Sequence, residues 1–386
     1  MLIEASEFFY KFNAGDKYRI ISTVNQDIYV DRTLSYRSEI INRISVEVAD
    51  ASGERGRLLA TFQSAEKTVP VGEENTAAKF FQWAMDYTTE YEQDRLGYMT
   101  IGSEFFMPVN RNIPVFPGRT LTPGGTWNAE GLEVHDFRDS FGIAEPYRIP
   151  FTANYIYLGE RTYRGETYPA FSVSYRIFFE PAPVSGTVFP RRIQAASDQI
   201  VYWDIDRGKA IGYEGHFRTI LDLSTGETWE YRGRAEAEVI DAEPMDRGEM
   251  ARSIAEEIAG LPDVSVRVTG EGIVISLDNI QFSPDSAVLA QSELAKLDRL
   301  ASILMNYPDR DILVGGHTGP GGTAAARLQL SMERAAAVAE YLLQRNVRTP
   351  DRILIRGFGS DRPIADNSTF EGMARNRRVE LTILEN

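Results

Sequence analysis

The chain has 386 residues, enough for two or three domains, and its apolar (43%) and charged (25%) contents are ordinary for globular proteins. Its net charge of −15 argues against nucleic acid as a partner, because phosphates would be repelled. The absence of cysteine excludes disulfides, zinc–thiolate sites and thiol catalysis.

Residues 1–118 are predicted to form a β-rich domain with one helix. Runs rich in β-branched and aromatic residues indicate strands at 18–24, 28–30, 40–48, 58–62 and 98–109. Residues 76–91 carry Phe80, Phe81, Met85, Tyr87 and Tyr91, a pattern that predicts an amphipathic helix packed on the sheet. Prolines and glycines between 110 and 125 indicate a domain junction.

Residues 119–245 are predicted to form a second β domain, an antiparallel sandwich or barrel. Short apolar and aromatic segments alternate with Gly/Pro turns at intervals of about 8–15 residues, a spacing typical of such folds. The predicted strands lie at 147–150, 154–159, 171–178, 200–206, 210–213, 216–223 and 228–240.

Residues 246–386 alternate between helical and strand patterns. Helices are predicted at 246–260, from 294 to 304 and at 331–345, and strands at 265–268, 272–277, 312–315, 353–355 and 379–384. This order predicts an α/β sandwich of βαβαβ type with helices on one sheet face. The expected fold class is therefore α+β multidomain, with two β-rich domains followed by this one.

Four spaced segments in the last domain form a recognisable set. They are Gly316-His317-Thr318, Leu330-Ser331-Met332-Glu333-Arg334-Ala335, Pro363-Ile364-Ala365-Asp366-Asn367 and Asn376-Arg377-Arg378-Val379-Glu380. In that order they resemble the GHTD, LSxxRA, P-x-A-x-N and NRRVE motifs of the OmpA-like peptidoglycan-binding family. The resemblance covers roughly the last 120 residues and leaves the N-terminal part unassigned.

The resemblance implies a peptidoglycan stem peptide as the ligand. In the family, the Asp of GHTD pairs with the ammonium of diaminopimelate, and the Arg of LSxxRA pairs with its carboxylate. Arg334 stands at the Arg position, but Gly319 replaces the Asp and Arg327 replaces the family's downstream Asn. We therefore expect that Gly319 weakens or abolishes conventional diaminopimelate binding while the fold stays intact.

Two alternatives remain open at this position. Another carboxylate, Asp285 or Asp366, replaces the missing one, or the ligand carries a different diamino acid. Thr318 offers a hydroxyl beside the lost Asp, and the resemblance implies a ligand-side role for Asn376 and Arg377. The expected ligand-binding residues are Thr318, Gly319, Arg327, Arg334, Asn376 and Arg377.

No catalytic or metal site is expected. His135, His216 and His317 lack ligand spacing, and His317 is expected to be structural. Asp204 and Asp206 supply too few oxygens for calcium, and Gly319-Pro320-Gly321-Gly322 lacks the Lys-Ser/Thr of a phosphate loop. We expect no cofactor and no enzymatic activity.

The leading expectation is a periplasmic, outer-membrane-associated envelope protein that associates with peptidoglycan and other envelope proteins. Met1-Leu2-Ile3-Glu4 does not resemble a signal peptide, so a signal or anchor is expected to lie outside this sequence. No apolar run approaches the ~18–20 residues that span a bilayer. The alternative is an envelope scaffold or carrier whose N-terminal β domains bind a lipid, a glycan or a protein; an enzyme ranks third.

Overall fold

The computed structural model describes residues 5–71, 79–241, 245–282 and 286–385. The chain forms two compact units. Unit 1 comprises Met1–Ser64, Thr68–Glu73 and Met85–Ala242, and unit 2 comprises Ala65–Lys67, Glu74–Ala84 and Glu243–Asn386.

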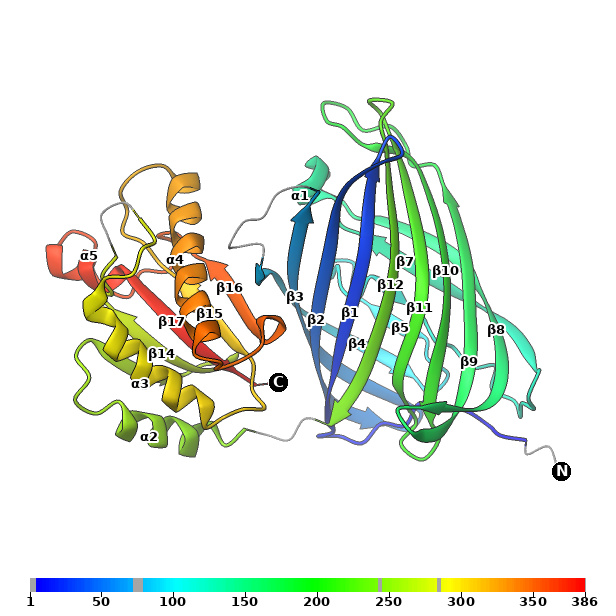
Figure 1. The fold of residues 1–386 in the computed structure, drawn as a ribbon. Coiled ribbons are helices and arrows are strands. Elements are labelled where there is room, and N and C mark those ends of the chain that lie inside the picture. Colours follow the sequence, from blue (N-terminus) through cyan, green and yellow to red (C-terminus); the bar gives the residue numbers. More distant parts are fainter. Residues whose placement is uncertain (1–4, 72–78, 242–244, 283–285, 386) are drawn as a thin grey trace. The chain divides into compact units, whose positions relative to one another are not determined.

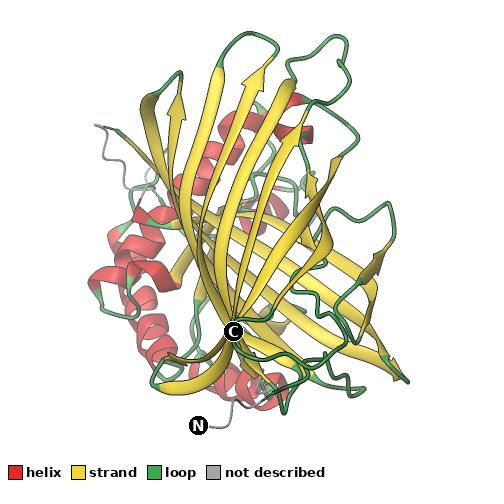
Figure 2. Ribbon diagram, turned by 90° about the vertical axis from the view of Figure 1, so that its right-hand side faces the viewer, coloured by secondary structure: helices red, strands yellow, loops and turns green. Residues whose placement is uncertain are grey.

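Unit 1 consists of long, twisted antiparallel strands (Figures 1 and 2). The elements in its part of the chain are β1 (Lys17–Val30), β2 (Thr33–Ser52), β3 (Arg55–Pro70), β4 (Phe81–Asp94), β5 (Met99–Ile101), β6 (Asn110–Arg111), β7 (Thr126–His135), helix α1 (Arg138–Phe141), β8 (Tyr147–Tyr163), β9 (Glu166–Phe179), β10 (Pro190–Asp204), β11 (Lys209–Leu223) and β12 (Thr228–Asp241). Hairpins join most neighbouring strands from β7 to β12.

The two β domains expected at 1–118 and 119–245 do not separate in the structure, because unit 1 contains most of both segments, whereas Ala65–Lys67 and Glu74–Ala84 group with unit 2. The sheet runs in the order β2-β1-β12-β11-β10-β9-β8-β7-β6. Strand β1 pairs with β12 from Tyr18 opposite Asp241 to Val30 opposite Trp229. Turn residues reveal hairpins between consecutive strands, whereas this pairing joins strands some 200 residues apart and has no local signal.

The core of unit 1 also combines the two expected domains. Phe116 packs against Trp203 and Phe171 with ring centroids 4.6 and 5.3 Å apart. Trp127 stacks on Tyr155 at 4.9 Å, and both are buried. Alternate residues of the long strands supply these rings, as in β8, where every second side chain from Ile149 to Tyr157 is buried. Aromatic side chains therefore fill the core of unit 1 around Phe116, Phe171 and Trp203.

The prediction of a helix at 76–91 is wrong for the residues of this segment that the structure describes. Residues 81–94 form strand β4, and residues 76–78 lie outside the described residues. Phe81, Trp83, Thr89, Tyr91 and Gln93 are buried at alternating positions. The same aromatic residues fit a period of two as well as a helical stripe, and the β-branched and aromatic composition favours the strand.

Unit 2 contains the α/β arrangement expected for the C-terminal domain. Its elements in chain order are α2 (Arg247–Glu257), β13 (Val264–Val268), β14 (Gly272–Asp278), α3 (Leu294–Met305), β15 (Ile312–Gly316), α4 (Ala324–Gln344), β16 (Ile353–Gly357), α5 (Phe370–Asn376) and β17 (Arg378–Leu384). The sheet order is β13-β14-β17-β15-β16, with β15 and β16 parallel and the other pairs antiparallel.

Helices α3 and α4 cover one face of this sheet. Leu297 and Leu300 of α3 and Val338 and Leu342 of α4 are fully buried in one cluster with the inward side chains of the strands. Side-chain caps begin two of the helices: Asp246 accepts from the Glu249 amide at α2, and Thr323 accepts from the Ala326 amide at α4. Helix α4 starts seven residues before the expected position of 331. The segment Leu330–Ala335, which matches the LSxxRA motif, therefore lies entirely on this helix.

Candidate functional site

The turn expected to bind the ligand connects the end of β15 to the start of α4. Gly316 and Gly357 at the strand ends are required by close approach, since a Cβ on either would meet Ser331 at 2.0 and 2.7 Å. The Ser331 hydroxyl donates to the Leu328 carbonyl and accepts from the Gly359 amide. The motif serine therefore holds the loop after β16 against α4.

Gly319 leaves an open position in this turn. A Cβ built on it would meet only Cγ of Arg377, at 4.0 Å, and its φ lies outside the left-handed region. A larger side chain would therefore fit without backbone strain. The side chain beside this position is the aliphatic stem of Arg377, and no carboxylate of the described residues lies within 4 Å of the built Cβ.

Arg327 supports the turn. Its Nη1 donates to the carbonyls of Gly322 at 2.6 Å and Pro320 at 3.3 Å. Where the family has Asn, this chain thus has an arginine that hydrogen-bonds to two backbone carbonyls of the Gly/Pro turn. Both bonds use Nη1, so the ligand contact expected for Arg327 stays a prediction for the rest of the guanidinium.

Arg334 lies two turns further along α4, beside the segment that follows β14. Its Nε donates to the Ser286 carbonyl at 3.3 Å, and its guanidinium lies 4.9 Å from the Phe282 ring centroid. The side chain is half-buried. Arg327 and Arg334 therefore contact different loops although they are two turns apart on one helix.

Asn376 is fully occupied by the loop preceding α5. Its Oδ1 accepts from the Ile364 and Ala365 amides, and its Nδ2 donates to the Ala365 carbonyl and to Asn367 Oδ1. The side chain is 2% exposed. The ligand contact expected for Asn376 is therefore replaced by a positioning role, in which both ends of the amide hold residues 364–367.

The other expected residues lie close to Gly319. The Thr318 hydroxyl is buried and has no hydrogen-bond partner among the described residues. Arg377 is half-buried, and its guanidinium is 6.0 Å from the ring of Phe370. Asp285 lies outside the described residues, and Asp366 accepts hydrogen bonds from the amide and hydroxyl of Ser368.

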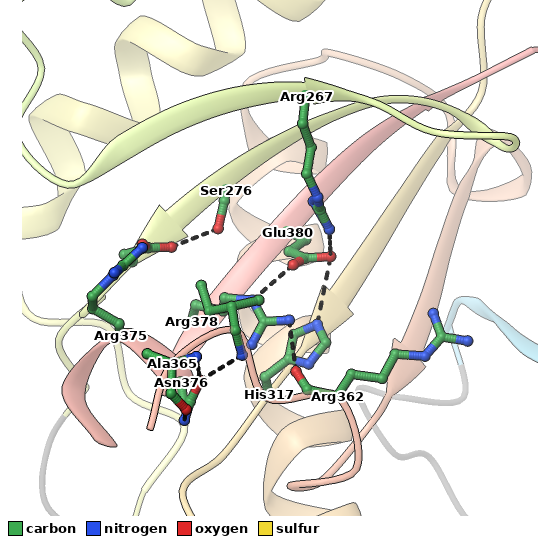
Figure 3. A network of polar contacts seen from close by, with 11 residues as sticks. Arg267, Ser276, His317, Arg362, Ala365, Arg375, Asn376, Arg378 and Glu380 are labelled. Atoms are coloured by element: carbon green, nitrogen blue, oxygen red, sulfur yellow. Dashed lines mark hydrogen bonds and ion pairs between the residues drawn. The ribbon is translucent and has the colours of Figure 1, made fainter. Parts of the chain in front are cut away.

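A buried polar network lies on the sheet next to the turn (Figure 3). Glu380 accepts from Arg378 Nε at 2.7 Å and from Arg267 Nη2 at 2.9 Å. His317 Nε2 is 3.6 Å from Glu380 Oε2, and its ring stacks on Phe358 at 4.7 Å. His317 is thus packed at the strand end, as its expected structural role requires.

Burial and charge set the protonation of this network. Burial opposes ionisation of Glu380, but the interactions with His317 and Arg378 outweigh it and lower the pKa of the carboxyl to about 2. Burial lowers the pKa of His317, so its imidazole is neutral at pH 7. The network therefore contains a buried carboxylate between two guanidiniums and a neutral ring.

The sequence analysis passed over most members of this network as functional candidates. Glu380 belongs to the NRRVE segment, so its motif gave a signal, whereas Arg267 and Phe358 lie far away in the chain and gave none. Arg378 is 2% exposed, so its side chain lies within the buried network and not in solvent.

The described residues contain no group of three or more His, Cys, Asp or Glu side chains placed to hold a metal ion. Among the helices in the described ranges, none is long and apolar enough to cross a membrane.

The OmpA family model matches residues 281–377, a segment that contains the ligand turn and His317 and ends just before Arg378 and Glu380. Residues 281–377 are an OmpA-family domain. No family model matches the N-terminal region.

Curated relatives of this chain resemble it over part of their length. Probable lipoprotein YiaD of Escherichia coli is 38% identical over 121 residues, which are 31% of this chain and 55% of YiaD. Peptidoglycan-binding protein ArfA of Mycobacterium tuberculosis is 40% identical over 104 residues, 27% of this chain and 32% of ArfA. Outer membrane porin F of Pseudomonas aeruginosa is 32% identical over 139 residues, 34% of this chain and 39% of the porin. The chain thus spans between about a third and just over half of these relatives, and none of the three is named as an enzyme.

Proposed function

We propose that this chain is a non-enzymatic periplasmic, outer-membrane-associated envelope protein whose OmpA-family domain associates with peptidoglycan through an altered ligand turn. The name of the mycobacterial relative, a peptidoglycan-binding protein, supports the ligand class. The observation that carries the altered recognition is Gly319, which stands beside Arg377 where the family has a carboxylate. Association with other envelope proteins belongs to the same proposal.

The physical argument concerns a ligand with charges at both ends. Diaminopimelate presents an ammonium and a carboxylate, so tight recognition requires an anion and a cation at a fixed separation. Arg334 remains for the carboxylate, but the ammonium end meets Gly319 and the side chain of Arg377. Removal of one partner from such a desolvated charge pair costs about 2–5 kcal/mol, which lowers affinity by about 30-fold or more.

The surviving charges favour a ligand end without a free amine. Arg334 and Arg377 are both half-buried, and Arg327 is held by its own loop. A stem peptide whose amine is acylated or cross-linked keeps its carboxylates and loses the ammonium that Arg377 would repel. The turn is therefore proposed to prefer cross-linked or otherwise amine-blocked stem peptides over free diaminopimelate.

The test restores the missing charge. The full chain and its Gly319→Asp variant are titrated calorimetrically with a meso-diaminopimelate tripeptide, with Gly319→Asn as the control of equal size without charge. Gly319→Asp should bind the tripeptide about tenfold or more tightly than the other two, since it supplies a charge-assisted bond of more than ~1.4 kcal/mol. Micromolar binding by the unaltered chain, or no gain in Gly319→Asp, would contradict the altered turn.

Association with the cell wall is tested separately. Purified sacculi are incubated with the full chain and with its Arg334→Gln variant, and the bound fraction is measured after sedimentation. The unaltered chain should sediment with sacculi, and Arg334→Gln should release a large part of it. Equal recovery of both in the supernatant would remove peptidoglycan as the ligand.

The alternative is an envelope scaffold or carrier in which the N-terminal region binds a lipid, a glycan or a protein. The aromatic rings that fill the interior around Phe116 and Trp203 count against a lipid held at that place. A scaffold that binds partners through its surface is compatible with the same core. Co-purification of a lipid with the chain from cell envelopes, detected by mass spectrometry, would favour the carrier over the wall-associated protein.

A further inference from the structure

A groove crosses the face of the unit 2 sheet opposite to α3 and α4. It has a volume of about 250 Å³ and lies between the β13–β14 hairpin and the loop after β16. Val274, Leu313 and Thr382 line it, whereas their neighbours in each strand, such as Ile275 and Val314, pack under the helices. Neither Gly319 nor any arginine of the ligand turn lines this groove. It is thus distinct from the residues expected to bind the ligand, and its volume lies just below the ~300–1,000 Å³ of typical small-molecule sites, which limits it to a small ligand.

Two guanidiniums flank this apolar floor. Arg362 lies over the ring of Phe358, 4.3 Å from its centroid, and forms no ion pair with a residue in the described ranges. Arg267 is held by Glu380 at 2.9 Å, and its side chain is 46% exposed. Glu271 lies at the hairpin rim of the groove. Because Glu380 is already neutralised by Arg378 and Arg267, Arg362 is left to attract an anion.

His317 adds a buried polar group to the same place. The residue is 2% exposed, and neither ring nitrogen has a hydrogen-bond partner among the described residues. Nε2 lies 3.8 Å from the position that a Cβ on Gly315 would take, and Gly315 lines the groove. The 3.6 Å separation from Glu380 is too long for a hydrogen bond. A buried imidazole that makes no hydrogen bond of ordinary length among the described residues is costly, so a ligand atom that hydrogen-bonds to it gains binding energy.

We propose that this groove is a second ligand site, for a small carboxylate that carries a short apolar body. The carboxylate accepts hydrogen bonds from Arg362 and from the neutral ring of His317, and the apolar body lies on Val274, Leu313 and Phe358. The site differs from the proposed peptidoglycan contact, because none of Thr318, Gly319, Arg327, Arg334 and Arg377 lines it. His317, at the start of the turn, adjoins both.

Gly315 keeps the groove open. A Cβ on this residue would lie 2.9 Å from Phe358 Cε2, so the ring that supports Arg362 and His317 would have to move. A glycine in the middle of a buried strand lowers strand stability. Glycine is present at position 315 because the Phe358 ring packs directly on the backbone of this residue.

The experiment uses the full chain labelled with ¹⁵N-histidine, since the chain has three histidines and two of them serve as internal references. Sodium butyrate is titrated, and the ring nitrogens of His317 are followed by NMR; a His317→Gln variant assigns them. Butyramide, which has the same shape without charge, and inorganic phosphate, which lacks the apolar body, are the comparison ligands. Arg362→Gln tests the site, and Arg299→Gln, on the helical side of the unit, is the matched control.

Butyrate should shift the His317 signals saturably with a Kd on the order of 1–10 mM, as expected for so small a ligand. His135 and His216 should not shift. Arg362→Gln should weaken binding at least tenfold, and Arg299→Gln should leave it unchanged. Absence of a saturable shift, or equal shifts with butyramide, with phosphate or in Arg362→Gln, would overturn the proposal.

Discussion

Both units contain a sheet with a buried core, but the paired strands of unit 1 and those around α4 in unit 2 are separated by very different lengths of chain. In unit 1, the strand at Lys17–Val30 is completed by Thr228–Asp241, and the rings of Phe8 and Phe116 pack with Phe171. In unit 2, helix α4 follows β15 and precedes β16 in the chain, and it packs on these two parallel strands. The β15–α4–β16 segment is continuous and leaves motifs in the sequence, whereas pairings of remote strands, such as β1 with β12 or β14 with β17, leave none.

A second contrast lies within unit 2. The ligand turn at Gly319 is open to solvent and is held by hydrogen bonds from side chains such as Arg327. The network two residues earlier, at His317, is buried and holds a carboxylate between two guanidiniums. Changes in the turn should therefore alter binding with little effect on stability, and changes in the network should do the reverse.

The largest expected effect would come from the aromatic core of unit 1. Trp203 is fully buried and lies 4.6 Å from Phe116 and 4.8 Å from Tyr10. Trp203→Ala should lower the free energy of unfolding of this unit by about 3–5 kcal/mol, through lost burial and a residual cavity. Urea unfolding, with hydrogen exchange of β8 and β9 peptides as the local probe, measures it. Phe178→Ala, at a ring that is 67% exposed, is the control and should change stability by less than about 0.5 kcal/mol.

The next effect concerns the buried carboxylate of unit 2. Glu380→Gln removes the charge that pairs with Arg378 and Arg267, and it leaves Arg378 buried and uncompensated. Loss of one partner of a buried ion pair lowers the free energy of unfolding by about 3–5 kcal/mol. The loss should be smaller in Glu380→Gln, because the glutamine amide oxygen still accepts one hydrogen bond. Exchange in β17 peptides should accelerate while β8 and β9 peptides stay unchanged. Equal acceleration in both units would show that they unfold together and would remove the contrast.

The smallest effect is a pH dependence confined to unit 2. His317 has a lowered pKa in the folded chain, so the unfolded state binds more protons below pH ~6.5 and stability falls as the pH falls through that value. Glu380, with its pKa lowered to about 2, adds a further loss below pH ~4.5, where the unfolded carboxyl begins to protonate. Between pH 7 and pH 5, β15 peptides should lose exchange protection and His317→Gln should remove that loss. A His317→Gln chain with unchanged acid sensitivity would contradict the assignment.

The sequence by itself determined most of the local structure of unit 2. The apolar stripe of Leu297, Ala301 and Leu304 predicted α3. Asn346 follows α4 in the left-handed conformation that is common after a helix C-terminus. The spaced motifs predicted the strand, turn and helix around Gly319 because each motif is a continuous segment. The same reading erred at β4, where five aromatic or apolar residues fitted a helical stripe as well as a strand.

Only the tertiary structure decided the rest. Three features follow from contacts between remote residues: β1 pairs with β12, the Asn376 amide is fully hydrogen-bonded to its own loop, and Arg267 reaches Glu380 across the intervening strand β14. Such contacts are selected by the total burial and hydrogen bonding of the folded chain, and no local pattern encodes them. The missing carboxylate at Gly319 could be read from one letter of the sequence, whereas the arginine beside it required the fold.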